Sequence, residues 1–504
     1  MPDISTNRRL AKNTLFLYCR MFIIMGVTFY TTRVLLQVLG VDDYGIYNTI
    51  GGIVVLFAFL NTAMVTTTQR FLNFYLGKSD EKQATASFSM SLIVHICIGV
   101  IVSLLTEVIG LWFLYYKMSL PPERFDAAFW TLHLSVLATF VNIVKSPYNA
   151  CIIAFEKMDF YAYVSIIEAV LKLAIVFVLS LSQYDHLIFY NILLLLVTIV
   201  IAYIYKYYCN KHYTISIFRI DFDKSLFKNL FQFSLYSIFG NAANVGAQHG
   251  VNLMVNSFTT VAVNAAIGVS SQLIHGVYSF ISNFQIAFNP SLVKMYARDE
   301  FVDLKRMICQ VSIYSFYLMI VISLPLLVYT DEYLTLWLKV VPDYTVPFCR
   351  LIIFTLLFDT IAEPLWKTVQ ASGDIKRYQI VTSLIILSNL PVAYVILMLG
   401  LSPVYIFVAK LIINGIAYFY RAYYVKNLIS FETDIYIKNV IFPIFVISTA
   451  LTVLGLTAYN IIDNYIISSL LMFIISVTIV MYLGLSAKER TFVLQSIKSK
   501  LRIK

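Results

Sequence analysis

The stretch HLIFYNILLLLVTIVIAYIYKYY, residues 186–208, contains one basic residue, Lys206, and no acidic residue. A helix that crosses a bilayer needs about 20 consecutive residues that are mostly apolar. Similar segments recur on both sides of this stretch, separated by short polar connections, and a short helix is expected at 333–338. The fourteen expected spans are 13–38, 45–69, 85–115, 126–153, 159–182, 186–208, 226–256, 260–289, 305–329, 346–370, 378–400, 402–424, 439–459 and 464–486.

The composition of the whole chain agrees with this interpretation. Of the 504 residues, 60% are hydrophobic and 13% are charged, whereas soluble globular domains carry about 25% charged residues. A chain this apolar could not present a solvated surface, which excludes a cytosolic enzyme, a secreted domain and a disordered protein. We therefore expect an all-α integral membrane protein with about 14 transmembrane helices.

Basic residues gather in every second connection between the expected spans. These connections carry, among others, Arg8, Arg9, Lys12, Arg70, Lys78, Lys82, Lys157, Lys211, Arg219, Lys294, Arg298, Lys376 and Arg377. The intervening connections are mainly acidic. Because cytoplasmic loops are enriched in Lys and Arg, both termini of this multi-pass protein are expected in the cytoplasm. The net charge of +10 then reflects topology and anionic headgroups, so we expect membrane lipids as partners and no nucleic acid.

The number of spans suggests an internal duplication. Six expected spans precede the basic connection at 209–225 and six follow it, before a last pair. Two six-helix halves joined by a cytoplasmic linker are typical of secondary transporters with parallel repeats. We expect an N-terminal lobe at 1–208, a linker at 209–225, a C-terminal lobe at 226–424, and a helix pair with a basic tail at 425–504.

Polar side chains follow one face of several expected spans, where lipid cannot satisfy them. In the span 226–256 they stand three or four residues apart, and others occur in 260–289 and 45–69. The side chains that this pattern selects are Asn48, Asn241, Asn244, Gln248, Asn252 and His275. They predict a central cavity lined by the first two helices of each half. The alternative is close helix packing with local hydrogen bonds.

Charged residues inside the expected spans bear on the cargo and its driving force. Arg20 lies about 10 Å along its helix from the cytoplasmic end, at 1.5 Å per residue. A charge there costs at least about 2.5 kcal/mol unless its long stem reaches the interface. Glu168 and Lys172, at i and i+4, are expected to neutralise each other. Asp359 and Glu363 share a face with a lysine and form either a coupling-ion site, for sodium or protons, or a structural ion-pair ladder.

Catalytic motifs are missing from the sequence. It holds no HExxH, no GxSxG and no Rossmann glycine set, and the LGKS at 76–79 lacks the first glycine of a P-loop. The six cysteines form no CxxC pair and indicate neither a disulfide framework nor a metal site. We therefore expect that the protein is not an enzyme and that it binds no metal and no cofactor, apart from a coupling ion.

The first part of the chain resembles a known family. The TRVL of 32–35, the LGVDDYGIYN of 39–48, the QRFLN of 69–73 and Arg20 resemble the start of bacterial polysaccharide flippases. These are the Wzx-like O-antigen transporters of the multidrug/oligosaccharidyl-lipid/polysaccharide exporter superfamily. The resemblance covers about the first 80 residues, and the remainder agrees in helix number and lobe arrangement.

The resemblance implies a substrate and a place of action. The substrate would be an undecaprenyl-diphosphate-linked oligosaccharide, moved to the periplasmic leaflet of the bacterial inner membrane for lipopolysaccharide and other surface polysaccharide synthesis. Other polysaccharide assembly proteins would be partners. Arg20 and then Arg70 are the expected diphosphate contacts, because a guanidinium fork matches phosphate, and the amides would serve the sugars.

A second function from the same superfamily stays open. A cation-coupled multidrug exporter would have the same helix number. Drug exporters of this type tend to carry a carboxylate near their first helix, whereas the span 13–38 carries arginine and no acid. This argues against cationic drugs as substrates.

Overall fold

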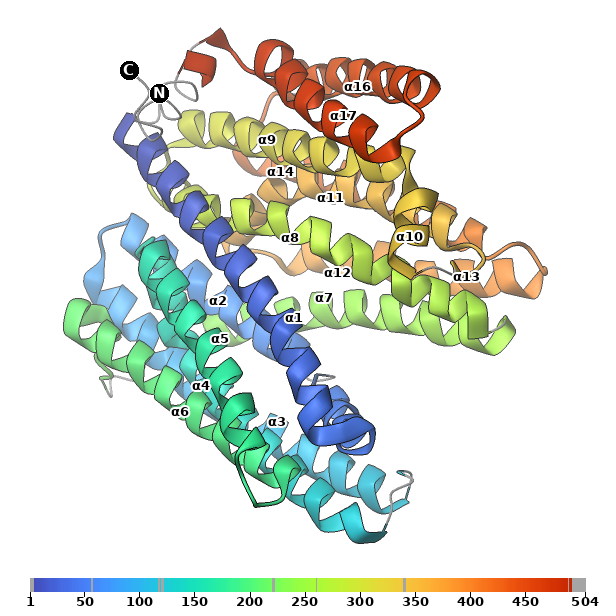
Figure 1. The fold of residues 1–504 in the computed structure, drawn as a ribbon. Coiled ribbons are helices and arrows are strands. Elements are labelled where there is room, and N and C mark those ends of the chain that lie inside the picture. The colour runs from blue at the N-terminus through green and yellow to red at the C-terminus, as the bar shows by residue number, and fades with distance from the viewer. Residues whose placement is uncertain are drawn as a thin grey trace, which may run out of the picture. The chain divides into compact units, whose positions relative to one another are not determined.

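The computed structural model describes residues 4–55, 58–116, 118, 122–219, 223–259, 261–338, 341–487 and 489–491. Within these ranges the regular elements are helices, and no strand occurs among them (Figure 1). The expected all-α fold is therefore confirmed. The expected short helix at 333–338 is also present, as the last part of α10 (Thr330–Leu338).

The first half of the sequence forms α1 (Ile4–Val55), α2 (Ala58–Gly77), α3 (Glu81–Tyr116), η1 (Pro122–Arg124), α4 (Phe125–Ala154), α5 (Met158–Ser180), α6 (His186–His212), η2 (Thr214–Ser216) and α7 (Lys224–Phe258). The second half forms α8 (Val261–Ala297), α9 (Phe301–Val328), α10, α11 (Thr345–Ser372), α12 (Lys376–Leu387), α13 (Asn389–Met398), α14 (Val404–Ile429), α15 (Thr433–Tyr436), η3 (Ile437–Ile441), α16 (Phe442–Ile461), α17 (Tyr465–Ile479) and η4 (Val480–Gly484).

Eleven helices in the described part of the chain are long and apolar enough to cross a membrane. Along α3 the large side chains of Ile101, Leu104 and Val108 are exposed, as expected for a surface that faces lipid. The expected count of fourteen is not confirmed. The expected spans at 45–69, 226–256 and 260–289 are absent from the eleven, because their polar stripes lower the hydropathy of helices that are otherwise long.

A single glycine separates the first two expected spans. Helical backbone geometry continues from Ile4 to Val55, but Gly40 interrupts it with φ 77° and ψ 175°. That backbone region is essentially restricted to glycine, because a Cβ would clash with the chain. The glycine of the LGVDDYG sequence is therefore required by a kink, and the residues after it run in a new direction (Figure 1).

The chain divides into two compact units. Unit 1 comprises Met1–Ala242 together with the short segments Val293–Glu300 and Gln370–Gln379, and unit 2 comprises the rest. The predicted linker at 209–225 includes the end of α6, the short η2 and the start of α7. The predicted lobes stay a prediction, because unit 1 also contains the first half of α7 and two later segments.

In unit 1, α1 packs against α5, and α4 packs against α3 and α6. Its buried core includes Phe88 and Tyr148 near one end and Leu35, Leu132 and Leu187 near the other. In unit 2, the expected C-terminal helix pair is present as α16 and α17, and both helices pack against α9 (Figure 1). The hydroxyl of Tyr329 there donates to Ser468 Oγ over 2.9 Å.

Candidate functional site: a polar cavity in unit 1

A cavity of about 430 Å³ lies within unit 1, between α1, α5 and α6. One face of α1 provides most of its wall, at intervals of three or four residues. The lining residues are Arg20, Ile24, Val27, Thr28, Thr31, Thr32 and Leu35 before the kink, Tyr44, Tyr47 and Asn48 after it, Ser165, Glu168, Ala169 and Lys172 of α5, and Tyr190 of α6. From Arg20 to Leu35 this wall runs for about 22 Å, at 1.5 Å per residue.

The charged groups stand at one end of the cavity. Glu168 Oε1 and Lys172 Nζ are 2.7 Å apart, so the expected i,i+4 pair is confirmed. The Arg20 guanidinium carbon lies 4.5 Å above the ring of Tyr161, a cation–π contact. Its Nε is buried and has no hydrogen-bond partner in the described part of the chain.

The electrostatic balance at this end is positive. Glu168 is influenced by Lys172, by Lys145 of α4 and by Arg20. Three cations therefore face a single carboxylate, and the carboxylate already has its hydrogen bond with Lys172. An anion that entered the cavity would meet the guanidinium group of Arg20, which lines it.

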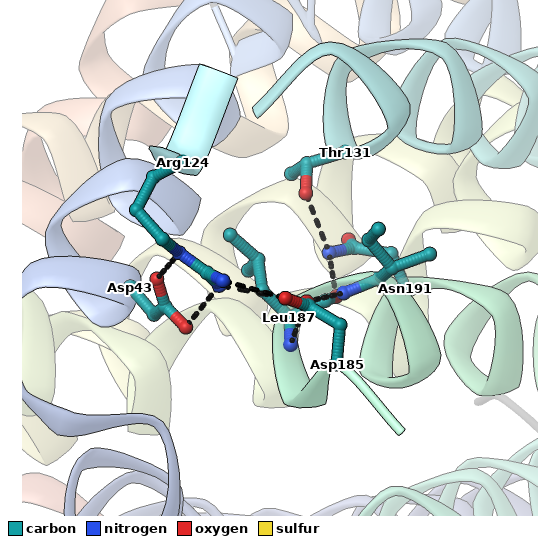
Figure 2. A network of polar contacts seen from close by, with 7 residues as sticks. Asp43, Arg124, Thr131, Asp185, Leu187 and Asn191 are labelled. Atoms are coloured by element: carbon teal, nitrogen blue, oxygen red, sulfur yellow. Dashed lines mark hydrogen bonds and ion pairs between the residues drawn. The ribbon is translucent and has the colours of Figure 1, made fainter. Parts of the chain in front are cut away.

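Two acids and an arginine of unit 1, which lie in the sequence just outside the apolar spans, form a polar network (Figure 2). Arg124 of η1 lies between Asp43, which follows the kink, and Asp185, which precedes α6. Its Nε donates to Asp43 Oδ1 over 2.8 Å, and its Nη1 donates to Asp185 Oδ2 over 2.5 Å. We call these three residues the Arg124 brace.

Asp185 also begins α6. Its Oδ1 accepts the backbone N–H groups of Leu187 and Ile188, which is a standard N-cap arrangement. Partial burial raises the pKa of the Asp185 carboxyl, but the hydrogen bonds from Arg124 and from the Ile188 N–H outweigh it, so its pKa lies below the ordinary value. The carboxylate is therefore ionised at neutral pH.

Arg70, the second expected phosphate contact, is not among the residues that line this cavity. It is 8% exposed, and its guanidinium carbon lies 4.6 Å from the ring centroids of both Phe71 and Phe74. Its Nε donates to the carbonyl of Gln370 over 3.1 Å and its Nη2 to the carbonyl of Ala371 over 2.9 Å. The structure gives Arg70 a bridging contact within unit 1, and its role in binding substrate stays a prediction.

The predicted amide stripe is divided between the units. Asn48 lines the cavity of unit 1, while Asn241, also in unit 1, donates to its own helix at the carbonyl of Ser237. Asn244 belongs to unit 2. Gln248 is exposed and Asn252 partly exposed, and neither lines a described cavity. The side chain of His275 lies outside those that the structure describes.

The two expected coupling residues, Asp359 and Glu363, make different contacts although they lie one turn apart on α11. Asp359 lines a second cavity, of about 70 Å³, within unit 2, together with Asn244, Asn414 and Arg421. Glu363 instead lies with its Oε1 3.5 Å from Lys367 Nζ, as in the ion-pair ladder that was the alternative. The assignment of both as a coupling-ion site stays a prediction.

Sequence reasoning missed the tyrosines of the cavity. Tyr44 and Tyr47 lie in the stretch that carries the family resemblance, but Tyr190 comes from the mostly apolar span 186–208. Thr31 shares a helical face with Arg20, as the sequence spacing predicts, and the same spacing could have found Thr28 and Thr32. No local signal relates Tyr190 to that face.

Comparison with known proteins shows which solved structures have a similar fold. Residues 237–395, about a third of the chain, match the MatE family model. No curated protein sequence matches the chain. Solved structures of MATE transporters of the MOP superfamily share its fold, although their sequence identities are low.

Three of these structures illustrate the likeness. A MOP superfamily transporter from Pyrococcus furiosus, for which reverse polarity of the binding pocket suggests a different function, has a TM-score of 0.71 at 12% identity, over 85% of this chain and 98% of that one. An outward-facing multidrug resistance MATE transporter has a TM-score of 0.70 at 13% identity, with the same coverage. A MATE transporter in the straight conformation has a TM-score of 0.68 at 15% identity, again over 85% and 98%.

Proposed function

We propose that this chain is a membrane transporter of an anionic, lipid-linked oligosaccharide. The cargo would be an undecaprenyl-diphosphate-linked repeat unit that crosses the bacterial inner membrane for surface polysaccharide synthesis. One observation carries the proposal: Arg20 has a buried Nε without a partner in the described part of the chain, at the edge of a cavity whose carboxylate is already paired.

Charge selection follows from this arrangement. A cation that entered the cavity would meet Arg20 and Lys172 in surroundings of low dielectric, where like charges are costly. A diphosphate would instead give Arg20 a charge-assisted hydrogen bond. The polar lining of threonine, serine, asparagine and tyrosine supplies further donors and acceptors for a sugar.

The competing function is a cation-coupled multidrug exporter. The match to the MatE model and the likeness to a multidrug resistance transporter favour it. Shared fold does not decide the substrate, because one fold carries many functions through different sites. The positive end of the cavity is the feature that separates the two proposals.

We further propose that transport is coupled to sodium or protons through Asp359, with Glu363 as a second candidate. Asp359 lines its cavity with Asn244, Asn414 and Arg421, so carboxylate and amide oxygens are present there, and a coupling cation would compete with Arg421 for the carboxylate. If Asp359→Asn and Glu363→Gln both leave transport in vesicles unchanged, these side chains are structural.

A deletion experiment tests the main proposal. Loss of the gene should stop surface glycan assembly and leave lipid-linked repeat units in the inner leaflet. It should not sensitise cells to ethidium, and expression in a drug-sensitive host should confer no dye resistance. Intact surface glycan together with strong dye efflux would establish the multidrug exporter instead.

A further inference from the structure

The two ends of the cavity in unit 1 differ in chemistry. All of its charged lining residues, Arg20, Glu168 and Lys172, lie toward one end. The other end, beyond the kink at Gly40, is lined by Tyr44, Tyr47, Asn48 and Tyr190. A ligand that filled the cavity would therefore need an anionic end and an uncharged end that combines apolar faces with hydroxyl groups.

The uncharged end suits a saccharide ring. The rings of Tyr47 and Tyr190 meet edge to face, with centroids 5.4 Å apart and planes at 75°. Tyr190 is 5% exposed and supports the partly exposed ring of Tyr47, which offers the cavity an apolar face. Asn48 Nδ2 donates to the carbonyl of Tyr44 over 2.9 Å, which leaves the amide oxygen as an acceptor for a ligand hydroxyl.

The Arg124 brace holds two acids that lie close to these tyrosines in the sequence. Asp43 precedes Tyr47 by four residues on the same helical segment, and Asp185 precedes Tyr190 by five residues at the start of α6. Each tyrosine is thus about one turn along its helix from an acid that Arg124 holds. Asn191, next to Tyr190, adds a 3.2 Å hydrogen bond to Thr131 Oγ1 of α4 (Figure 2).

We propose that the Tyr47–Tyr190 end is a sugar subsite and that Arg124 is its positioning residue. Arg124 does not touch the ligand. It fixes the segment after the kink relative to the start of α6, and so keeps the two rings in their edge-to-face contact. Its side chain is 27% exposed, so its ion pairs are partly screened by solvent and contribute less to global stability than fully buried pairs do. Loss of the brace is therefore expected to alter the subsite more than the fold.

Because the sugar subsite presupposes the proposed function, the test measures the phosphate and the sugar separately. The full chain, purified into lipid nanodiscs, is titrated calorimetrically with inorganic phosphate and with a panel of hexose and N-acetylhexosamine 1-phosphates. The wild-type protein should bind its preferred sugar phosphate at least tenfold more tightly than phosphate. We call this ratio the sugar increment.

Variants then separate positioning from binding. Arg124→Ala and Asp43→Asn should reduce the sugar increment to within about twofold of unity while the affinity for phosphate stays unchanged. Tyr47→Ala should have the same effect with the brace intact, which covers the case that a brace variant does not fold. Arg124→Lys should restore part of the increment, because a point charge cannot pair with both acids as the guanidinium fork does.

The control is His133→Ala. It removes another partly exposed polar contact of unit 1, between His133 Nδ1 and Glu107 Oε1 at 2.8 Å, and neither residue lines the cavity. This variant should keep the full sugar increment. An unchanged increment in both Arg124→Ala and Tyr47→Ala, or no increment in the wild-type protein, would overturn the subsite. Failure of the wild-type protein to bind even phosphate would overturn the proposed anionic substrate itself.

Discussion

At the scale of single residues, the two arginines that the sequence selects have different surroundings. Arg20 lines a cavity and has a buried Nε without a partner in the described part of the chain, whereas Arg70 is buried and donates to two backbone carbonyls. The same residue type therefore stands in two environments, one at a cavity and one in a contact between distant parts of the chain.

Replacement of Arg20 is expected to stop transport without loss of protein. Arg20→Ala should abolish glycan export at a normal protein level, because the phosphate loses its charge-assisted partner. Arg20→Lys should restore part of it. Arg33→Ala is the matched control, since Arg33 is exposed on the same helix and does not line the cavity. Full export by both Arg20 variants would show that Arg20 is not a substrate contact.

Replacement of Arg70 is expected to weaken the fold. Arg70→Ala leaves the carbonyls of Gln370 and Ala371 without their present donor, at a cost of about 2–4 kcal/mol. Gly373→Ala should also destabilise, because Gly373 has φ +85° and a Cβ there would clash with Arg70 Nη2. Thermal unfolding in detergent measures both, with the exposed Lys78→Ala as control. An unchanged unfolding temperature for Arg70→Ala would contradict this assignment.

At the scale of elements, the kink of α1 and the start of α6 are held by the Arg124 brace. The carboxylate of Asp185 both caps α6 and pairs with Arg124, so protonation of this one group weakens both interactions. Local helix geometry and the arrangement of two helices are thereby linked through a single side chain.

This link predicts a pH dependence. The pKa of Asp185 is lower in the folded protein than its ordinary value of about 3.9, so its stabilisation is fully present above that value and is lost as the pH falls through the folded pKa. Asp185→Asn should therefore lower the unfolding temperature at pH 7, and the difference from wild type should shrink below about pH 4. Glu123→Gln is the control, because Glu123 is an exposed acid next to Arg124 in the sequence. A difference that did not change with pH would exclude the carboxylate as its source.

At the scale of the whole molecule, the number of membrane crossings depends on three helices. Eleven helices of the described chain meet the requirements of length and apolar composition. The polar stripes of α2, α7 and α8 account for the difference from the expected fourteen. Polar side chains at membrane depth are tolerated when they face other helices or water, so low hydropathy does not by itself remove a span.

Reporter fusions decide this count. With fourteen spans and both termini in the cytoplasm, a reporter that is active in the periplasm should be silent after Lys504 and active between α7 and α8. The alternation of basic and acidic connections is the physical reason. Activity after Lys504 would mean an odd number of spans, and silence between α7 and α8 would mean that α7 does not cross.

The sequence by itself determined the features of this protein that depend on composition and on residues close together along the chain. Long apolar runs predict the helices, and the i,i+4 spacing predicts the Glu168–Lys172 pair, because both are local properties of an α-helix. The glycine at the kink lies where two expected spans meet.

Only the tertiary structure decided which side chains share a site. Arg70 reaches carbonyls 300 and 301 residues away, Arg124 joins acids 81 and 61 residues away, and Tyr190 reaches a cavity built mainly by α1. Helical periodicity tells which residues share a face, but it does not tell which face of a distant helix lies opposite. That choice depends on how all the helices pack together, and so it is fixed by the fold as a whole.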